Sequence, residues 1–446
     1  MLVSFSVENF LSFKHKASFS MVASREKQHG DRLPNLKGYM RLLPVAAIYG
    51  GNASGKTNFF QAINFARHMV VHGTQPDGRI PVEPFRLDEK CKTQPSTFVF
   101  EFWVDEKCYE YGFSITAKMV IEEWLIEVLK TTEKELFRRT GSSMAWNAQL
   151  KKDESLRFIF QGTRDNQLFL TNAVSQKNER LRPIYLWFRD VLVPIAPDSR
   201  FEPFDQFIQP DSPLYDFINE TLSRMDTGVS RLGGETIPFE NLPIPPDMLN
   251  KVREELTEDR IFRFRQDPTG ERFVVFLKDG EIQAQKLVSQ HLDANQNEIK
   301  FDLRDESDGT LRMIDLLPAF LAISQPGISR VYIIDELDRS LHTLLTKHLL
   351  ESYLAGCGEA SRSQLLFTTH DVLLMDQDLL RRDEMWVAER DEHGCSELIA
   401  FSEYKEVRND KDIRKSYLQG RFGGVPRILF NGSFRKKSKG LKEERN

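Results

Sequence analysis

The sequence predicts an α/β fold, and three short apolar segments lead to that prediction. Residues 43–48 form an apolar run that enters a glycine-rich turn, and a helical pattern follows over residues 56–71. Residues 331–334 and 364–367 are two further apolar runs, each ending in polar residues and each next to a helical pattern. Buried strands that alternate with helices are typical of a parallel or mixed sheet covered by helices.

The remaining patterns divide the chain into four predicted units. Residues 1–175 carry several alternating segments after the first helix, which predicts an antiparallel β lobe. Residues 176–295 contain many prolines and helical patterns, so we expect an inserted, mainly helical lobe. Residues 296–430 return to the α/β pattern. For the basic run over residues 431–446 we expect a disordered tail, with an electrostatic contact to nucleic acid or a partner as the alternative.

Composition excludes several classes of protein. The chain has 446 residues, a formal net charge of −5, 40% hydrophobic residues and 28% charged residues. This balance is that of a soluble globular protein and argues against a uniformly basic nucleic-acid coat. No membrane span or signal peptide is indicated, and the four cysteines lack metal-ligand spacing. We therefore expect a cytoplasmic protein with reduced thiols.

The glycine-rich turn matches the phosphate-loop pattern G-x-x-x-x-G-K-[ST]. Small residues let the backbone N–H groups turn toward phosphates, and a helix that begins at the loop directs its positive end at the same anion. The pattern predicts that Lys56 contacts the β- and γ-phosphates of ATP and that the Thr57 hydroxyl ligates Mg²⁺. The expected nucleotide-binding residues are Gly50, Gly51, Asn52, Ala53, Ser54, Gly55, Lys56, Thr57 and Asn58.

Two acids follow the apolar strand at residues 331–334. A single acid after a buried strand is common and often structural, but Asp335 and Glu336 lie side by side in a chain that already has a phosphate loop. Asp335 is predicted to orient Mg²⁺, and Glu336 is predicted to act as the general base on water.

Two further motifs contain candidate site residues because of their position relative to the acidic strand. Ser307, Asp308, Gly309 and Thr310 open a predicted helix before the acidic strand, and taken alone they would be a helix cap. His370 directly follows the apolar run at residues 364–367. A single histidine is usually structural, but at this strand end, downstream of the acidic pair, it is a candidate sensor of the γ-phosphate.

The order of these motifs resembles that of ABC-type ATPases. The resemblance implies an ABC-ATPase head with a mixed β-sheet core, in which the Ser307–Thr310 signature binds ATP held by the opposite subunit. Asp308 replaces the more usual glycine of that signature. The resemblance also makes His370 the switch histidine and places Asp338 in the loop that crosses the dimer interface. The opening residues 7–14 are similar to the N-terminal turn of SMC and RecF-type heads.

The length of the segment between Thr57 and Ser307 indicates which branch of the ABC-type ATPases the chain resembles. Transporter ATPases have a shorter segment there, and SMC proteins have a long coiled coil. Residues 168–178, 185–188 and 417–426 also resemble the AAA_15/AAA_21 group, which includes the ATPase half of OLD nucleases and the RloA and AbiL type phage-defence ATPases. The family's Mg²⁺-sensing glutamine is assigned to Gln176, with Gln167 as a rival.

The resemblance implies a homodimer that sandwiches two Mg²⁺–ATP and hydrolyses them to control an effector in anti-phage defence. Too few residues follow His370 for a toprim nuclease domain, so a separate nuclease or toxin is the expected partner, and a nucleic acid or phage protein is a candidate trigger. One alternative is a RecF/SMC-like ATPase that binds DNA across the dimer. Another is a binding module in which ATP is structural, although the predicted base Glu336 argues against it.

Overall fold

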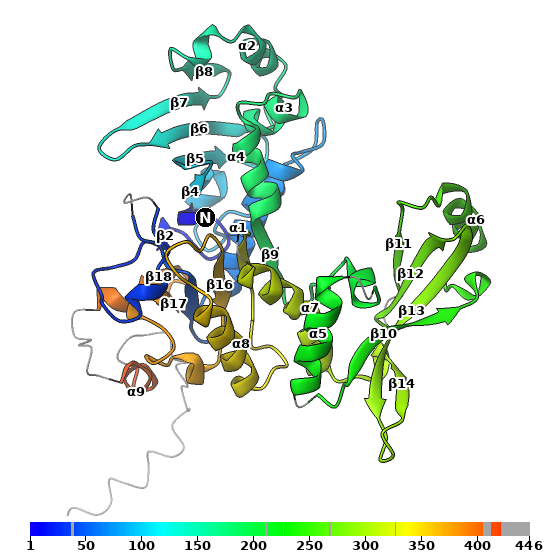
Figure 1. The fold of residues 1–446 in the computed structure, drawn as a ribbon. Helices are drawn as coiled ribbons and strands as arrows, with labels where there is room; N and C mark the ends of the chain where they lie inside the picture. The colour runs from blue at the N-terminus through cyan, green and yellow to red at the C-terminus, as the bar shows by residue number, and fades with distance from the viewer. Residues whose placement is uncertain are drawn as a thin grey trace, which may run out of the picture.

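The computed structural model describes residues 1–36, 40–209, 212–225, 227–266, 269–325, 327–404 and 412–420. Three sheets organise these residues, and Figure 1 shows the N-terminal and inserted sheets projecting from different sides of a central one. The predicted α/β fold with a mixed sheet core is confirmed. The predicted tail at residues 431–446 lies outside the described residues. In the described part of the chain, no helix is long and apolar enough to cross a membrane.

The central sheet has six strands in the order β18-β17-β3-β16-β15-β9. Strands β17, β3, β16, β15 and β9 run parallel to their neighbours, and only β18 is antiparallel, to β17. Their bounds are β3 Val45–Tyr49, β9 Leu192–Ile195, β15 Val331–Ile334, β16 Gln364–Thr368, β17 Met385–Arg390 and β18 Ser396–Ala400.

Helices cover both faces of this sheet because its strands are apolar on both sides. Ala46 and Ile48 of β3 pack into one core with α1 (Lys56–Val71), and Val45, Ala47 and Tyr49 pack into a second core. The second core contains apolar residues of α7 (Asp308–Ser324) and α8 (Thr343–Ala355). A buried parallel sheet is expected to show this near-continuous apolar sequence.

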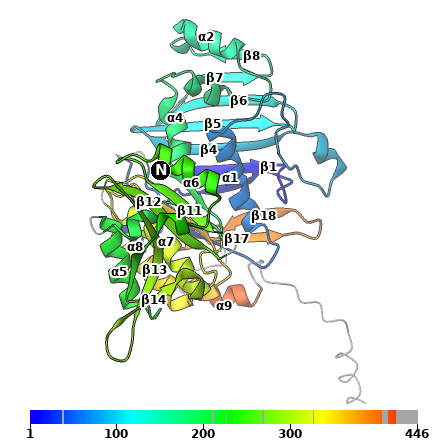
Figure 2. The same cartoon turned by 90° about the vertical axis from the view of Figure 1, so that its right-hand side faces the viewer.

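The N-terminal lobe is a seven-stranded antiparallel sheet, as predicted. Its order is β2-β1-β4-β5-β6-β7-β8, and Figure 2 shows β4 to β8 stacked above the central sheet. Alternate residues of β4 are buried, which is the period expected of a half-buried strand. The bounds are β1 Leu2–Glu8, β2 Ala17–Ser20, β4 Ser96–Val104, β5 Lys107–Ile115, β6 Val120–Val128, β7 Glu133–Thr140 and β8 Ser143–Trp146.

The inserted lobe is mixed, which corrects the expectation of a mainly helical one. Helices α5 (Pro213–Arg224) and α6 (Pro246–Glu255) account for part of the expected helical content. A sheet in the order β10-β13-β12-β11, with β14 on β13, makes up the body of the lobe. Strand β10 contains two adjacent glycines, which are depleted in strands and hide it in the sequence. The bounds are β10 Arg231–Ile237, β11 Phe262–Gln266, β12 Glu271–Lys278, β13 Glu281–Leu292 and β14 Glu298–Asp302.

Four short helices complete the described fold. They are α2 (Glu154–Gln161), α3 (Phe169–Ser175), α4 (Arg182–Leu186) and α9 (Ile413–Leu418). Helix α4 is followed by a π-helical turn, Trp187–Val191, and the chain then enters β9, in a region where the sequence predicted mainly helices. Strand β9, which lies beside β15, was therefore missed at the sequence level.

Candidate nucleotide site

The predicted motifs meet at one edge of the central sheet. Residues 50–57 follow β3, Asp335 and Glu336 follow β15, and Thr369 and His370 follow β16. The strands are parallel and in level register, so their carboxyl ends lie together. Ligands of open α/β sheets bind in the crevice outside these carboxyl ends.

The loop at residues 50–57 needs glycine at two points. Gly50 has φ 154° and Gly55 has φ 111°, both in the region that side chains disfavour. A Cβ atom on Gly55 would lie 2.4 Å from Ser396 Oγ, so the loop packs directly against the start of β18. Gly55 also precedes the first turn of α1, whose free N–H groups are suited to phosphate. Asn52, Ala53 and Thr57 are the exposed residues of the loop.

Lys56 is the buried cation of the site. Its Nζ donates to the carbonyl oxygens of Gly50 at 2.8 Å and Gly51 at 3.1 Å, and lies 3.4 Å from His370 Nδ1. Burial lowers the pKa of Lys56 to about 8, against the opposing effect of the nearby carboxylates, of which Asp335 is the strongest. The pKa of His370 is also lowered, first by burial and then by Lys56. The phosphate loop and the strand end of β16 are therefore in contact.

Asp335 and Thr57 form a pair suited to a divalent cation. Asp335 is fully buried, and its Oδ1 accepts a hydrogen bond of 2.6 Å from the Thr368 hydroxyl. Burial raises the pKa of Asp335, while Thr368 and Thr57 lower it. In the described part of the chain, Asp335 Oδ2 makes no hydrogen bond of good geometry. A free carboxylate oxygen beside a hydroxyl is the hard oxygen set that Mg²⁺ prefers, so these residues fit the predicted metal.

Glu336 is held in an uncommon backbone conformation. Its φ is 50°, and its N–H donates to the Thr368 hydroxyl at 2.8 Å. The side chain is one-third exposed and lies 3.9 Å from Arg339. Non-glycine residues with positive φ cost free energy and cluster at functional sites. The same threonine therefore fixes both acids, and the Glu336 side chain remains partly exposed at the sheet edge.

The signature residues form a helix cap and contact the loop after β15. Ser307 Oγ accepts from the Thr310 N–H at 3.1 Å, and Ser307 and Asp308 are exposed. A Cβ on Gly309 would lie 2.7 Å from the carbonyl oxygen of Ser340, so α7 begins against that loop. Among the described residues, Ser307 to Thr310 make no hydrogen bond to residues 50–57.

Asp338 lies in the same loop and joins it to His370. Its Oδ2 accepts from the His370 N–H at 3.3 Å. Its Oδ1 is buried and has no hydrogen-bond partner in the described part of the chain. Lys56, Asp338 and His370 therefore form one connected group at the sheet edge.

Gln176 is not brought to this edge. It is exposed at the end of α3, where its Nε2 donates to Asn172 Oδ1 at 3.1 Å. Helix α3 packs near the last turn of α1, since the Thr171 hydroxyl donates to the carbonyl of Val70. The first residue of α1 is about 20 Å away from that turn at 1.5 Å per residue. Gln176 is therefore removed from the set of metal residues.

The rival Gln167 lies at the same distant end of α1. Together with residues of α3 and α4 it lines a cavity next to His72 and Gly73, which follow α1. The segment that does follow a strand beside Asp335 is residues 196–200, after β9. It contains no glutamine, and only recognition of β9 as a strand would have pointed to it.

Ser12, Ser396 and Arg312 also lie beside the site and were not predicted as site residues. Ser12 contacts the predicted Asn58 directly, and Ser396 contacts it through Ser12. Asn58 Nδ2 donates to Ser12 Oγ at 2.7 Å, and Ser12 Oγ lies 2.8 Å from Ser396 Oγ. Ser12 belongs to the N-terminal turn, so that turn does lie against the phosphate loop. Arg312 of α7 is the third residue; its Nη2 donates to the Asp335 carbonyl at 3.4 Å.

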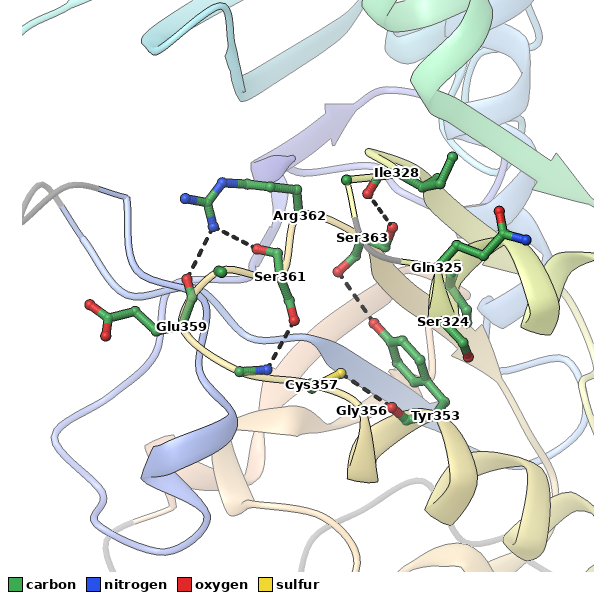
Figure 3. A pocket seen from close by; sticks show the side chains of 14 residues that line it. Ser324, Gln325, Ile328, Tyr353, Gly356, Cys357, Glu359, Ser361, Arg362 and Ser363 are labelled. Carbon is green, nitrogen blue, oxygen red and sulfur yellow. Dashed lines mark hydrogen bonds between the residues drawn. The ribbon is translucent and has the colours of Figure 1, made fainter.

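A cavity of about 350 Å³ lies at the opposite edge of the sheet (Figure 3). It is formed by the loops that precede β15 and β16, and Tyr353 donates from its hydroxyl to the Ser363 carbonyl there at 3.3 Å. Its one arginine, Arg362, donates to the backbone oxygens of Glu359 and Ser361. The cavity therefore lacks the convergent charged groups found at the carboxyl edge.

A family profile matches the part of the chain that contains this site. The family is described as "AAA domain, putative AbiEii toxin, Type IV TA system", and the match spans residues 45–376. The chain belongs to this family. The AAA_21 match begins within the first residues of the central sheet and includes Lys56, Asp335, Glu336 and His370, so the predicted resemblance to an AAA-type ATPase is confirmed.

Solved structures of SMC heads align over most of the chain. The SMC head domain from Thermotoga maritima aligns with a TM-score of 0.36 and 12% identity, over 90% of this chain and 98% of that chain. An SMC head bound to the C-winged helix domain of ScpA aligns with a TM-score of 0.41 and 12% identity, over 90% of this chain and 97% of that chain. No curated protein sequence matches the chain significantly.

Proposed function

We propose that the chain is an ATP hydrolase in which Glu336 is the general base. The observation that carries the proposal is the Thr368 bridge, which holds Asp335 and Glu336 next to the phosphate loop. Lys56 and the N-terminus of α1 bind the phosphates, and His370 lies next to Lys56 to contact the terminal one. Mg²⁺, held by Thr57 and Asp335, would neutralise charge on the β- and γ-phosphate oxygens.

The proposed reaction needs one proton acceptor. A water oxygen attacks the γ-phosphorus, the bond from that phosphorus to the β–γ bridging oxygen breaks, and ADP leaves with that oxygen. Glu336 takes the proton of the attacking water, and its partial exposure leaves it reachable by water at the sheet edge.

The exposed signature supports a dimer in this proposal. Ser307 and Asp308 face solvent, and their helix cap leaves the positive end of α7 accessible. Two heads in head-to-tail contact would place this end of one head on the ATP of the other. The second copy thus completes a site that one chain leaves open.

The test of the hydrolase compares Glu336→Gln with the wild-type chain. We expect the variant to bind Mg²⁺–ATP with similar affinity while turnover falls by about 100-fold or more, since general-base catalysis contributes on that order. Light scattering with ATP should show a longer-lived dimer for the variant. Equal turnover in the two proteins would reject Glu336 as the base.

We propose further that ATP turnover controls a separate effector in anti-phage defence. The family description names a putative toxin and a type IV toxin–antitoxin system, which supports a role of this kind. Plaque assays with the full locus carrying Lys56→Ala test it, because this change removes the phosphate-binding cation. Protection that persists unchanged in the variant would reject an ATP-dependent defence role.

A further inference from the structure

Two charged residues of α7 are buried on one face of that helix. Arg312 and Asp315 are three residues apart, which places them one turn apart on the same side. Arg312 is 3% exposed and Asp315 is 5% exposed. Burial of charged groups is costly unless they are paired, so each of these residues is expected to have partners that compensate its burial.

Arg312 contacts the acidic strand end and its neighbouring loop. Its Nη1 donates to the carbonyl oxygens of Ala196 at 3.3 Å and Pro197 at 3.2 Å, and its Nη2 donates to the Asp335 carbonyl at 3.4 Å. The Asp335 N–H in turn donates to the Ile195 carbonyl at 3.0 Å. One guanidinium thus holds the backbone of the predicted metal-binding acid against the end of β9.

Asp315 contacts the inserted lobe. Its Oδ1 accepts from Arg272 Nη2 at 2.7 Å, and Arg272 belongs to strand β12 of that lobe. The same oxygen accepts from the Phe201 N–H at 2.9 Å, and Arg200 lies 3.5 Å from Oδ2. The side chains of Arg272 and Asp315 are each 2% exposed, so this ion pair is shielded from water.

These contacts form one continuous path. It runs from β12 through Arg272 to Asp315, along one turn of α7 to Arg312, and then to the backbone of Asp335. Glu336 is the next residue, and Ser307 begins the same helix. A buried ion pair is weak support for stability but defines one relative position of the parts it joins. Through these contacts, β12 is connected to the acidic pair Asp335–Glu336 and to the signature residues at the start of α7. A displacement of β12 would therefore displace both.

We propose that Arg272, Asp315 and Arg312 are positioning residues through which the inserted lobe sets the rate of ATP turnover. The inference rests on the proposed ATPase function. Whatever binds the lobe and displaces β12 would act on Glu336 by this path, because a helix and a buried pair move together. Within the described structure, none of the three residues forms a hydrogen bond with the phosphate loop, so nucleotide affinity should depend on them little.

The test is a double-mutant cycle on the full chain with Arg272→Gln, Asp315→Asn and the double variant. Asp315→Asn leaves the buried Arg272 without its carboxylate, and Arg272→Gln leaves Asp315 with only the partly exposed Arg200. The double change removes both members of the buried pair. We expect each single variant to lower kcat by about tenfold while KM for ATP stays within about twofold. The double variant should lose about tenfold rather than the hundredfold that independent effects would give.

Arg263→Gln is the matched control. Arg263 lies in β11 of the same lobe and pairs with the buried Asp205, so this change also strips a guanidinium from a buried carboxylate. It leaves α7 untouched, and we expect turnover within about twofold of wild type. Arg312→Lys keeps the positive charge but cannot make all the guanidinium hydrogen bonds. We expect it to retain only part of kcat, which would show that positioning of the Asp335 backbone matters in addition to the charge.

The outcomes separate this inference from the proposed function. If the wild-type chain does not hydrolyse ATP, the hydrolase proposal itself is overturned. If the wild type turns over ATP, single variants with wild-type kcat at unchanged melting temperature would overturn the coupling. So would variants that lose ATP binding and turnover together, or effects that multiply in the double variant. A kcat loss with retained KM and non-additive effects supports the coupling.

Discussion

The ammonium group of Lys56 lies 3.4 Å from Nδ1 of His370, and the two side chains come from opposite ends of the motif order. Both are partly removed from water, and the pKa of His370 is lowered first by burial and then by Lys56. The pKa of Lys56 is about 8 and burial is the main cause. This burial gives the site a pH dependence that exposed lysines do not have.

We predict that affinity for Mg²⁺–ATP falls as pH rises above about 8. Phosphate binding favours charged Lys56, so its pKa is higher in the complex than in the free chain. At pH values below the pKa of Lys56 in the free chain, the lysine is already protonated and the affinity does not change with pH. Above it, binding must take up a proton, and affinity falls by up to about tenfold per pH unit. Titration calorimetry between about pH 7 and pH 9.5 measures this.

Lys56→Arg is the control for this prediction. Arginine stays protonated throughout that range, so the variant should bind ATP with little change from about pH 7 to pH 9.5. An affinity that falls equally in both proteins would assign the effect to another group and would contradict the role of Lys56.

Thr368→Val should damage both stability and turnover. The hydroxyl donates to Asp335 and accepts from the Glu336 N–H, and valine has nearly the same shape without it. Leaving a buried donor and acceptor unpaired costs about 1–3 kcal/mol, so the free energy of unfolding should fall by about 2 kcal/mol. Denaturant unfolding measures this loss, and turnover should fall as well because Glu336 loses its anchor.

Thr368→Ser separates the hydroxyl from the methyl group. Serine keeps both hydrogen bonds, so this variant should retain most of the turnover and lose only packing. A valine variant as active and as stable as wild type would mean that the bridge does not hold the two acids.

The sequence predicted the motifs of the site better than the connections between them. Asp335, Glu336 and His370 follow apolar runs, and parallel strands bring such ends to one edge. That argument needs only local pattern and general topology. It predicted strands β3, β15 and β16 of the central sheet, while alternating apolar segments predicted the antiparallel lobe.

The errors arose where short segments have no clear period. Strand β9 has four residues and follows a π-helical turn directly, so the aromatic pattern of the helix masked it. Gln176 was then assigned by resemblance and not by placement. Arg312 carries no pattern in the sequence, because its role depends on carbonyl groups supplied by residues more than 20 positions away.

Gly55→Ala should remove nucleotide binding. The new Cβ would lie 2.4 Å from Ser396 Oγ and the residue would keep a φ of 111°, which alanine disfavours. The loop would have to shift, and its N–H groups would no longer converge on phosphate. Binding of a fluorescent ATP analogue checks this. Adding Ser396→Gly to this variant removes the overlap between the new Cβ and the Ser396 side chain. The unfavourable φ of residue 55 remains, so the double variant should regain only part of the stability that Gly55→Ala loses.

Gly309→Ala tests the contact between the signature helix and the loop after β15. The Cβ would lie 2.7 Å from the carbonyl oxygen of Ser340, which is backbone and cannot rotate away. Helix α7 must therefore move at its first turn, while the phosphate loop is untouched. We expect ATP binding by single chains within about twofold of wild type and turnover reduced by about tenfold or more, because the exposed end that meets the second head is displaced. Gly358→Ala is the control, because a Cβ there would meet no atom within 4 Å and the residue lines the cavity at the opposite edge of the sheet. Equal turnover in the Gly309→Ala and wild-type chains would show that this end of α7 takes no part in hydrolysis.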